Sequence, residues 1–70
     1  MSDKVPTFKI GDSVRPLGTI TNQQYGIADK LGVITGFRGH DVFGNERFLV
    51  DFLDNKTPSG IISASQLRHA

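Results

Sequence analysis

Arg47-Phe48-Leu49-Val50-Asp51-Phe52-Leu53 decides the fold, because it is the clearest strand pattern in the chain. Side chains of a β-strand point to opposite faces in turn, so the two phenylalanines and the valine share one face. Arg47, Leu49 and Asp51 share the other face. The stretch therefore predicts a strand whose phenylalanine face lies in the core.

A second strand pattern precedes this one at residues 31–37. Val33, Thr35 and Phe37 alternate along it and are expected on one face. Gly32 and Gly36 suit a close backbone approach or a bend, because glycine has no side chain to obstruct either. We therefore expect the sheet to curl at this strand.

The rest of the chain reads as short strand patterns separated by turn residues. Residues 13–17 and 60–63 predict two further strands, and Pro16 suits an edge or a bulge. Residues 38–46 predict a long hairpin in which Gly44-Asn45 supplies the positive φ angles. A sustained helical period is missing, so the expected class is all-β.

The predicted architecture is a single barrel of about five antiparallel strands over residues 8–67. A flexible N-terminus is expected at residues 1–7 and a C-terminal tail at residues 68–70. The side chains expected inside the barrel are Val14, Val33, Phe37, Phe48, Val50, Phe52, Ile62 and Leu67.

Composition limits the chemistry available to the chain. It has 70 residues and no cysteine, which excludes disulfides and thiolate metal sites, and its two histidines lie far apart in sequence. We therefore predict no metal site, no cofactor and no catalytic residues. A formal net charge of +1 would steer a polyanion only weakly. No apolar run approaches the ~20 residues that span a bilayer, so we expect no membrane partner and a cytoplasmic location.

Several segments, taken in order, resemble SH3-like barrels: residues 8–15, Gly32-Val33-Ile34, residues 48–52 and residues 62–67. The resemblance implies an SH3-like barrel for this chain. Domains with the KOW motif have a similar Gly-Asp-x-Val opening, here Gly11-Asp12-Ser13-Val14, and that resemblance implies contact with RNA or polymerase surfaces. The loop that follows is longer in this chain than in the motif.

Photosynthetic accessory subunits are a second resemblance. Reaction-centre subunit IV of photosystem I and the variable chain of ferredoxin-thioredoxin reductase are similar at Val14-Arg15, at the Tyr-bearing loop and at Val50-Asp51-Phe52. This resemblance implies a protein-docking accessory subunit of a larger complex.

Plasmid-borne type II dihydrofolate reductases are a third, more distant resemblance, carried by residues 8–15 and by overall size. That family has Val-Gln-Ile-Tyr on its late strand, where this chain has Ser59-Gly60-Ile61-Ile62. The Gln and Tyr that hold ligands are missing, so a divergent reductase is the least favoured interpretation. We expect the protein not to be an enzyme.

The candidate binding residues are Tyr25, Arg38, His40, Phe43 and Arg47. The last four belong to or border the predicted hairpin, where basic groups suit phosphates and an exposed aromatic suits a base or a partner's pocket. The alternative is that Phe43 folds back on the barrel while the basic groups are simply solvated and pair locally with Asp41 and Glu46. Tyr25 lies in the long polar loop at residues 18–30, which has room for a helical turn. The ring of Tyr25 suits an interface with a partner. The alternative is that it caps the edge of the barrel.

These features predict a non-enzymatic binding module that contacts nucleic acid or a nucleic-acid-bound transcription or translation machine. A protein-docking subunit is the alternative. Leu49 and Ile61 point apolar groups away from the phenylalanine face, so a homodimer is also expected.

Overall fold

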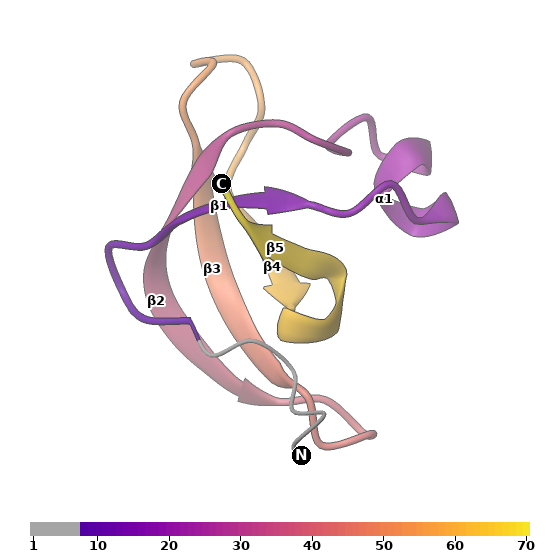
Figure 1. Ribbon diagram of the computed structural model, residues 1–70, viewed down its shortest axis with the longest axis vertical. Helices are drawn as coiled ribbons and strands as arrows, with labels where there is room; N and C mark the ends of the chain where they lie inside the picture. The colour runs from indigo at the N-terminus through magenta and orange to yellow at the C-terminus, as the bar shows by residue number, and fades with distance from the viewer. Residues whose placement is uncertain (1–7) are drawn as a thin grey trace.

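The described part of this computed structural model, residues 8–70, forms one antiparallel sheet (Figure 1). The predicted flexible N-terminus at residues 1–7 lies outside the described residues. The strand order is β4-β3-β2-β1-β5. The strands are β1 (Ser13–Pro16), β2 (Gly32–His40), β3 (Glu46–Phe52), β4 (Gly60–Ser63) and β5 (Leu67–His69). The all-β prediction is confirmed.

The sheet curls around the core without closing into a barrel, so the prediction of a closed barrel is wrong. β4 and β5 are the two ends of the strand order, and a 3-10 turn, η1 (Ala64–Gln66), joins them. A closed barrel would need backbone hydrogen bonds between β4 and β5. Both strands are short, and the described sheet has no such pairing between them. The five antiparallel strands fit an SH3-like fold in general.

Nine apolar side chains form the core of the described chain, and six of the eight predicted ones are among them. The prediction is wrong for Val33, which is half-buried, and for Phe37, which is 46% exposed. Ile34 and Phe8 are buried instead. The core consists of Phe8, Val14, Ile34, Phe48, Val50, Phe52, Ile62, Ala64 and Leu67.

A β-bulge in β2 explains the two errors on that strand. Ile34 pairs with Val50, but the next pairs are Gly36 with Leu49 and Phe37 with Phe48, so β2 carries one extra residue. The extra residue interrupts the alternation, which puts Ile34 rather than Val33 in the core. Phe37 shares the face of Phe48, with ring centroids 5.7 Å apart, but lies near the end of the sheet.

The C-terminal residues belong to the sheet. The sequence places residues 68 and 69 in a tail, whereas in β5 they pair with Arg15 and Val14 of β1. The ring of His69 stacks on that of Phe8, with centroids 4.5 Å apart. The Phe8 ring meets the Phe48 ring edge to face, with centroids 6.0 Å apart. Phe8 therefore links the C-terminal strand to the centre of the core.

The β1–β2 loop contains a short helix, α1 (Ile20–Gln24), which confirms the predicted helical turn. Asn22 is 2% exposed, and its Nδ2 donates to the Leu17 and Gln66 carbonyls at 2.9 and 3.4 Å. These bonds satisfy a buried amide and hold the loop against η1. In residues 8–70, α1 is far too short to cross a membrane, and no other helix qualifies.

Candidate functional site

The β2–β3 hairpin ends in a turn organised around the Asp41 carboxylate. The backbone N–H groups of Phe43 and Asn45 donate to Asp41 Oδ1 at 2.8 and 2.9 Å. Gly44 has a φ of +85°, as the sequence predicts, whereas Asn45 is not among the described residues with positive φ. The Gly44 N–H donates to the Asp41 carbonyl oxygen, which closes a turn over residues 41–44. This turn needs a positive φ angle at Gly44 alone.

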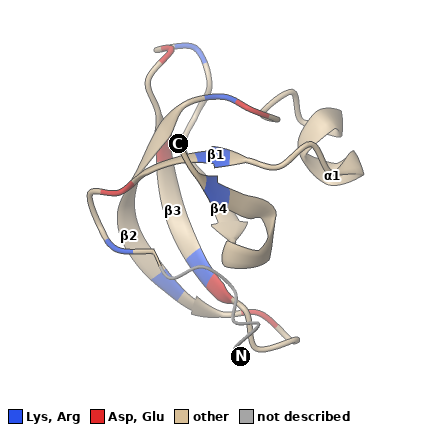
Figure 2. Ribbon diagram, in the orientation of Figure 1, with Lys and Arg blue, Asp and Glu red and all other residues tan. Residues whose placement is uncertain are grey.

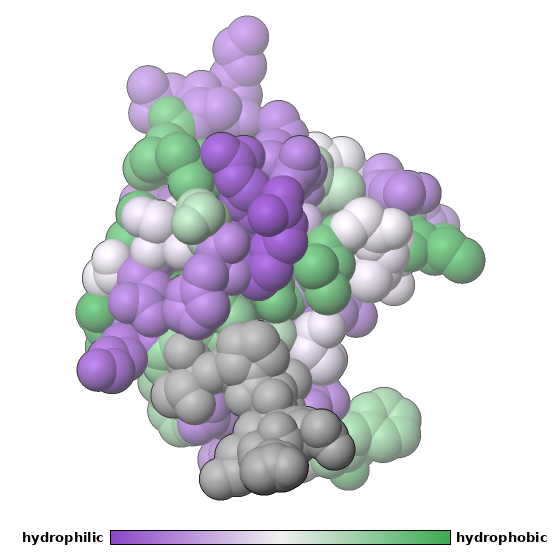
Figure 3. Space-filling model, viewed as in Figure 1, coloured by the Kyte–Doolittle hydropathy of each residue, from purple (hydrophilic) through white to green (hydrophobic). Residues whose placement is uncertain are grey.

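Asp41 also ties the turn to β4, because Ser63 Oγ donates to its Oδ2 at 3.2 Å. The N–H of Asn45, followed by the N–H of Phe43 and the side chains of Asn45 and Ser63, holds the pKa of Asp41 below its usual value. Val42 and Phe43 occupy exposed positions of the turn that Asp41 holds together. Figure 3 shows this tip as apolar surface projecting from the molecule.

Phe43 does not fold back on the sheet. Its side chain is 85% exposed, and that of Val42 is 92% exposed. Single exposed apolar side chains are common on protein surfaces, but Val42 and Phe43 are adjacent and form a small continuous apolar tip. The turn therefore presents an aromatic and an aliphatic group on a hydrogen-bonded support.

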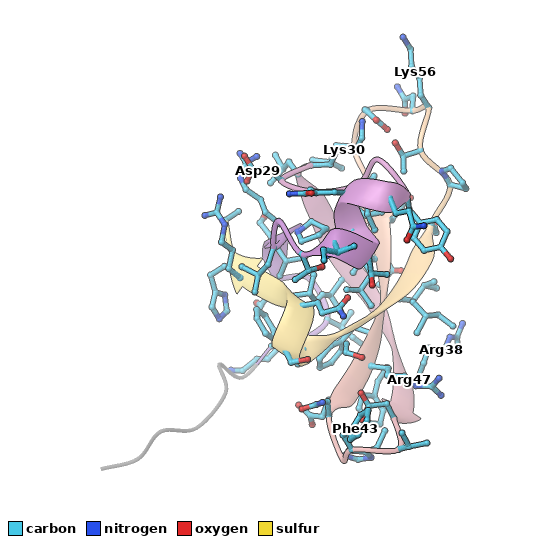
Figure 4. The ribbon with its side chains drawn as sticks, turned by 90° about the vertical axis from the view of Figure 1, so that its right-hand side faces the viewer. Asp29, Lys30, Arg38, Phe43, Arg47 and Lys56 are labelled. Atoms are coloured by element: carbon cyan, nitrogen blue, oxygen red, sulfur yellow. The ribbon has the colours of Figure 1, made fainter. Side chains whose placement is uncertain are left out.

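Arg38 and Arg47 lie close together near the hairpin end of the sheet, with Phe43 beyond them (Figure 4). Figure 2 shows two basic positions side by side on β2 and β3 at this end. Arg47 Nη2 donates to the Arg38 carbonyl at 2.9 Å, and its Nε is buried without a hydrogen-bond partner in the described chain. The ion pairs found within residues 8–70 involve neither arginine. The two arginines therefore do not form the alternative ion pairs with Asp41 and Glu46.

His40 lies away from the two arginines. Its ring meets that of Phe37 edge to face at 5.7 Å, and its cross-strand partner is Glu46. The register shifts between Phe37 and His40, and Gly39 takes a φ of +76°, so the alternation along β2 is broken a second time. The structure therefore groups Arg38, Arg47 and the tip, and turns His40 toward the face of Phe37.

Tyr25, the remaining predicted site residue, lies at the other end of the sheet and is 75% exposed. It forms one wall of a groove of about 270 Å³ that runs along β4. The groove is also lined by Ile27, Phe52, Ile62 and the segment from Thr57 to Ile61. No local sequence pattern indicates this groove, since it combines three separate segments of the chain.

The β3–β4 loop beside the groove is built on Asp54 in the way that the hairpin tip is built on Asp41. The Thr57 hydroxyl donates to the Asp54 carboxylate at 2.7 Å, and Lys30 Nζ donates to it at 3.0 Å. The backbone N–H groups of Thr57 and Lys56 donate to the same carboxylate at 2.9 and 3.1 Å. The Thr57 hydroxyl and N–H, with Lys30 and the Lys56 N–H, hold the pKa of Asp54 far below its usual value.

Asp54→Asn should destabilise the protein near neutral pH, with an effect that fades in acid. The unfolded carboxyl titrates near its ordinary value of 3.8 and the folded one well below it, so the unfolded state binds the proton first. The stabilisation is complete above the unfolded pKa and is lost as the pH falls toward the folded pKa. Urea unfolding of parent and variant at several pH values measures this. A difference that stays constant with pH would mean that the charge of Asp54 is not its source.

The described residues contain no group of three or more His, Asp or Glu side chains placed to hold a metal ion. No protein-family model, curated protein or solved structure matches this chain. Function is therefore inferred from two surfaces of the described residues, the hairpin end and the groove.

Proposed function

We propose that this chain is a non-enzymatic binding module whose β2–β3 hairpin contacts nucleic acid, free or within a transcription or translation machine. One observation carries the proposal. Arg38 and Arg47, without carboxylate partners in the described chain, lie beside an exposed aromatic at a hydrogen-bonded turn.

The chemistry of the hairpin suits a single strand. Arginine guanidinium groups contact phosphates, and Phe43 can stack on a base only where that base is not already stacked in a duplex. The net charge of +1 implies weak binding that depends strongly on salt. The resemblance of the Gly11-Asp12-Ser13-Val14 opening to KOW domains supports the same proposal.

A labelled single-stranded oligonucleotide titrated at low salt should bind, and Phe43→Ala should weaken it by about 1–3 kcal/mol, the usual contribution of one base stack. Arg38→Ala should lower the slope of log affinity against log salt by about 0.7, as expected for one lost phosphate contact. Fluorescence anisotropy measures both effects.

Lys56→Ala is the matched control, because it removes the same charge from the opposite end of the molecule (Figure 4). It should leave oligonucleotide binding unchanged apart from the small effect of net charge. Absence of binding at low salt, or equal losses in Arg38→Ala and Lys56→Ala, would reject the hairpin as a nucleic-acid site.

Protein docking is the second candidate function, favoured by the exposure of Val42 and Phe43. Aromatic anchors of this kind dominate the energy of many protein interfaces. A protein partner that is released by Phe43→Ala, together with no oligonucleotide binding, would favour this candidate. Both candidates are non-enzymatic, so turnover of dihydrofolate with NADPH above background would contradict either.

A further inference from the structure

Two rings lie together on one face of the β2–β3 hairpin, and the proposed function involves neither of them. Phe37 is 46% exposed, and its ring meets the His40 ring edge to face, with centroids 5.7 Å apart. His40 is exposed as well. The Phe37 ring also packs edge to face on the buried Phe48, again with centroids 5.7 Å apart. Phe37 is therefore supported by the core, while nearly half of its side chain stays accessible.

The backbone of β2 brings these two rings to the same face. In a regular strand, residues 37 and 40 would point to opposite faces, because they are three positions apart. Gly39 takes a φ of +76°, and the register shifts between Phe37 and His40, so the alternation is broken between them. Irregularities of this kind redirect side chains and are frequent beside functional sites. The pairing of the rings is therefore a consequence of the fold at Gly39.

The rings and the arginines lie on opposite faces of the hairpin. Arg38 follows Phe37 along β2, so the alternation of the strand directs it to the other face. Arg47 lies close to Arg38 (Figure 4). The cross-strand partner of His40 is Glu46, whose negative charge opposes a phosphate on the side of the rings. The hairpin therefore offers cations on one face and rings on the other.

One side of β2 is open near the hairpin, as far as the described residues show. β2 pairs with β1 only at Gly32 and Val33, and the backbone of Ile34 bonds to the segment before β1. From Thr35 to His40, no described strand lies on this side of β2. A nucleic-acid strand that contacts the arginines can therefore direct a base past this edge to the rings.

We infer that Phe37 is a second base-stacking residue of the hairpin, in addition to Phe43, with His40 beside it. The inference rests on the proposed function and states which part of the ligand each face binds, phosphates on the arginine face and a base on Phe37. His40 is three residues before Phe43, so their Cα atoms are at most about 11 Å apart. Bases close together in one single strand can therefore reach both positions. Phenylalanine stacks on any base, and the imidazole nitrogens can hydrogen-bond to its edge.

Tryptophan fluorescence tests the inference, because the chain contains no tryptophan and each replacement introduces a single reporter. The probe is a single-stranded oligonucleotide of deoxycytidine, added at low salt. The fluorescence of Phe37→Trp should be quenched, because a base would stack on the indole. Tyr25→Trp is the matched control, since Tyr25 is an exposed aromatic at the other end of the sheet, and its fluorescence should not change. Equal quenching of the two variants would overturn the inference.

Phe37→Leu removes the aromatic ring but keeps an apolar side chain against Phe48. It should weaken oligonucleotide binding by about fivefold or more, as expected for one lost base stack. Tyr25→Leu should bind like the parent, and Phe37→Tyr should also do so, because it keeps a ring. Fluorescence anisotropy of a labelled oligonucleotide measures these affinities, and far-UV spectra should match that of the parent. An affinity of Phe37→Leu equal to that of the parent would overturn the inference.

An abasic oligonucleotide separates stacking from an indirect effect on the fold, because it keeps the phosphates and lacks the bases. It should bind the parent and Phe37→Leu with equal affinity. If Phe37→Leu weakened the abasic oligonucleotide as much as the deoxycytidine one, Phe37 would act through the fold, and the inference would be overturned.

The inference and the proposed function fail in different ways. Quenching of Phe43→Trp without quenching of Phe37→Trp would overturn the inference and leave the hairpin site in place. Absence of oligonucleotide binding by the parent at low salt would reject the hairpin site, and the inference with it. A protein partner released by Phe37→Leu, together with no oligonucleotide binding, would assign the two rings to protein docking and also overturn the inference.

Discussion

Phe48→Ala should lower the free energy of unfolding by about 3–5 kcal/mol, as expected for truncating a buried phenylalanine. The Phe48 side chain is 3% exposed and lies between the rings of Phe8 and Phe37. Its cross-strand partner on β4 is Ile62. The truncation therefore removes contacts to β2, to β4 and to the segment before β1 at once.

A loss of this size is a large fraction of the stability of the domain, because the free energy of unfolding is about 0.05–0.15 kcal/mol per residue and this chain has 70 residues. Urea unfolding followed by far-UV circular dichroism should show a variant largely unfolded at moderate temperature. Phe52→Ala, at 4% exposure, should behave similarly.

Phe43→Ala is the control for these truncations. Its ring is 85% exposed, so its removal should change the free energy of unfolding by less than about 0.5 kcal/mol. If Phe48→Ala and Phe52→Ala melted like the parent and like Phe43→Ala, the assignment of the core would be wrong.

Gly32→Ala should destabilise the fold by about 1–3 kcal/mol, because it overpacks the contact between β2 and β3. A Cβ at this position would lie 2.6 Å from Val50 Cγ1, 3.2 Å from Phe52 Cδ1 and 3.3 Å from the Asp51 carbonyl oxygen. Val50 is fully buried and has little room to move. Relief of the clash therefore requires the strands to separate.

Gly60→Ala tests whether the effect comes from the clash or from the loss of a glycine. A Cβ at Gly60 would meet nothing within 4 Å, so this change should be neutral or slightly stabilising. Chemical denaturation of both variants makes the comparison. Equal stability of the two variants would contradict the close approach at Gly32.

The candidate site was predictable only in part. Arg38, Phe43 and Arg47 are close in sequence, so a hairpin necessarily brings them to one end of the sheet. Closeness in sequence does not decide on which face of the hairpin each side chain lies. His40 is also close in sequence, but Gly39 and the register shift after Phe37 turn it away from the arginines. The groove at Tyr25 needed the folded chain, since residues 25, 52 and 58 meet only there.

The sequence by itself determined the all-β class and the buried face of β3, because both depend on local alternation and on turn residues. It did not determine the buried face of β2, since the bulge opposite Leu49 exists only when β2 and β3 pair. Only the tertiary structure decided that the sheet stays open and that β4 and β5 are its edges. An edge is a property of strand order, and strand order arises from contacts between residues distant in sequence.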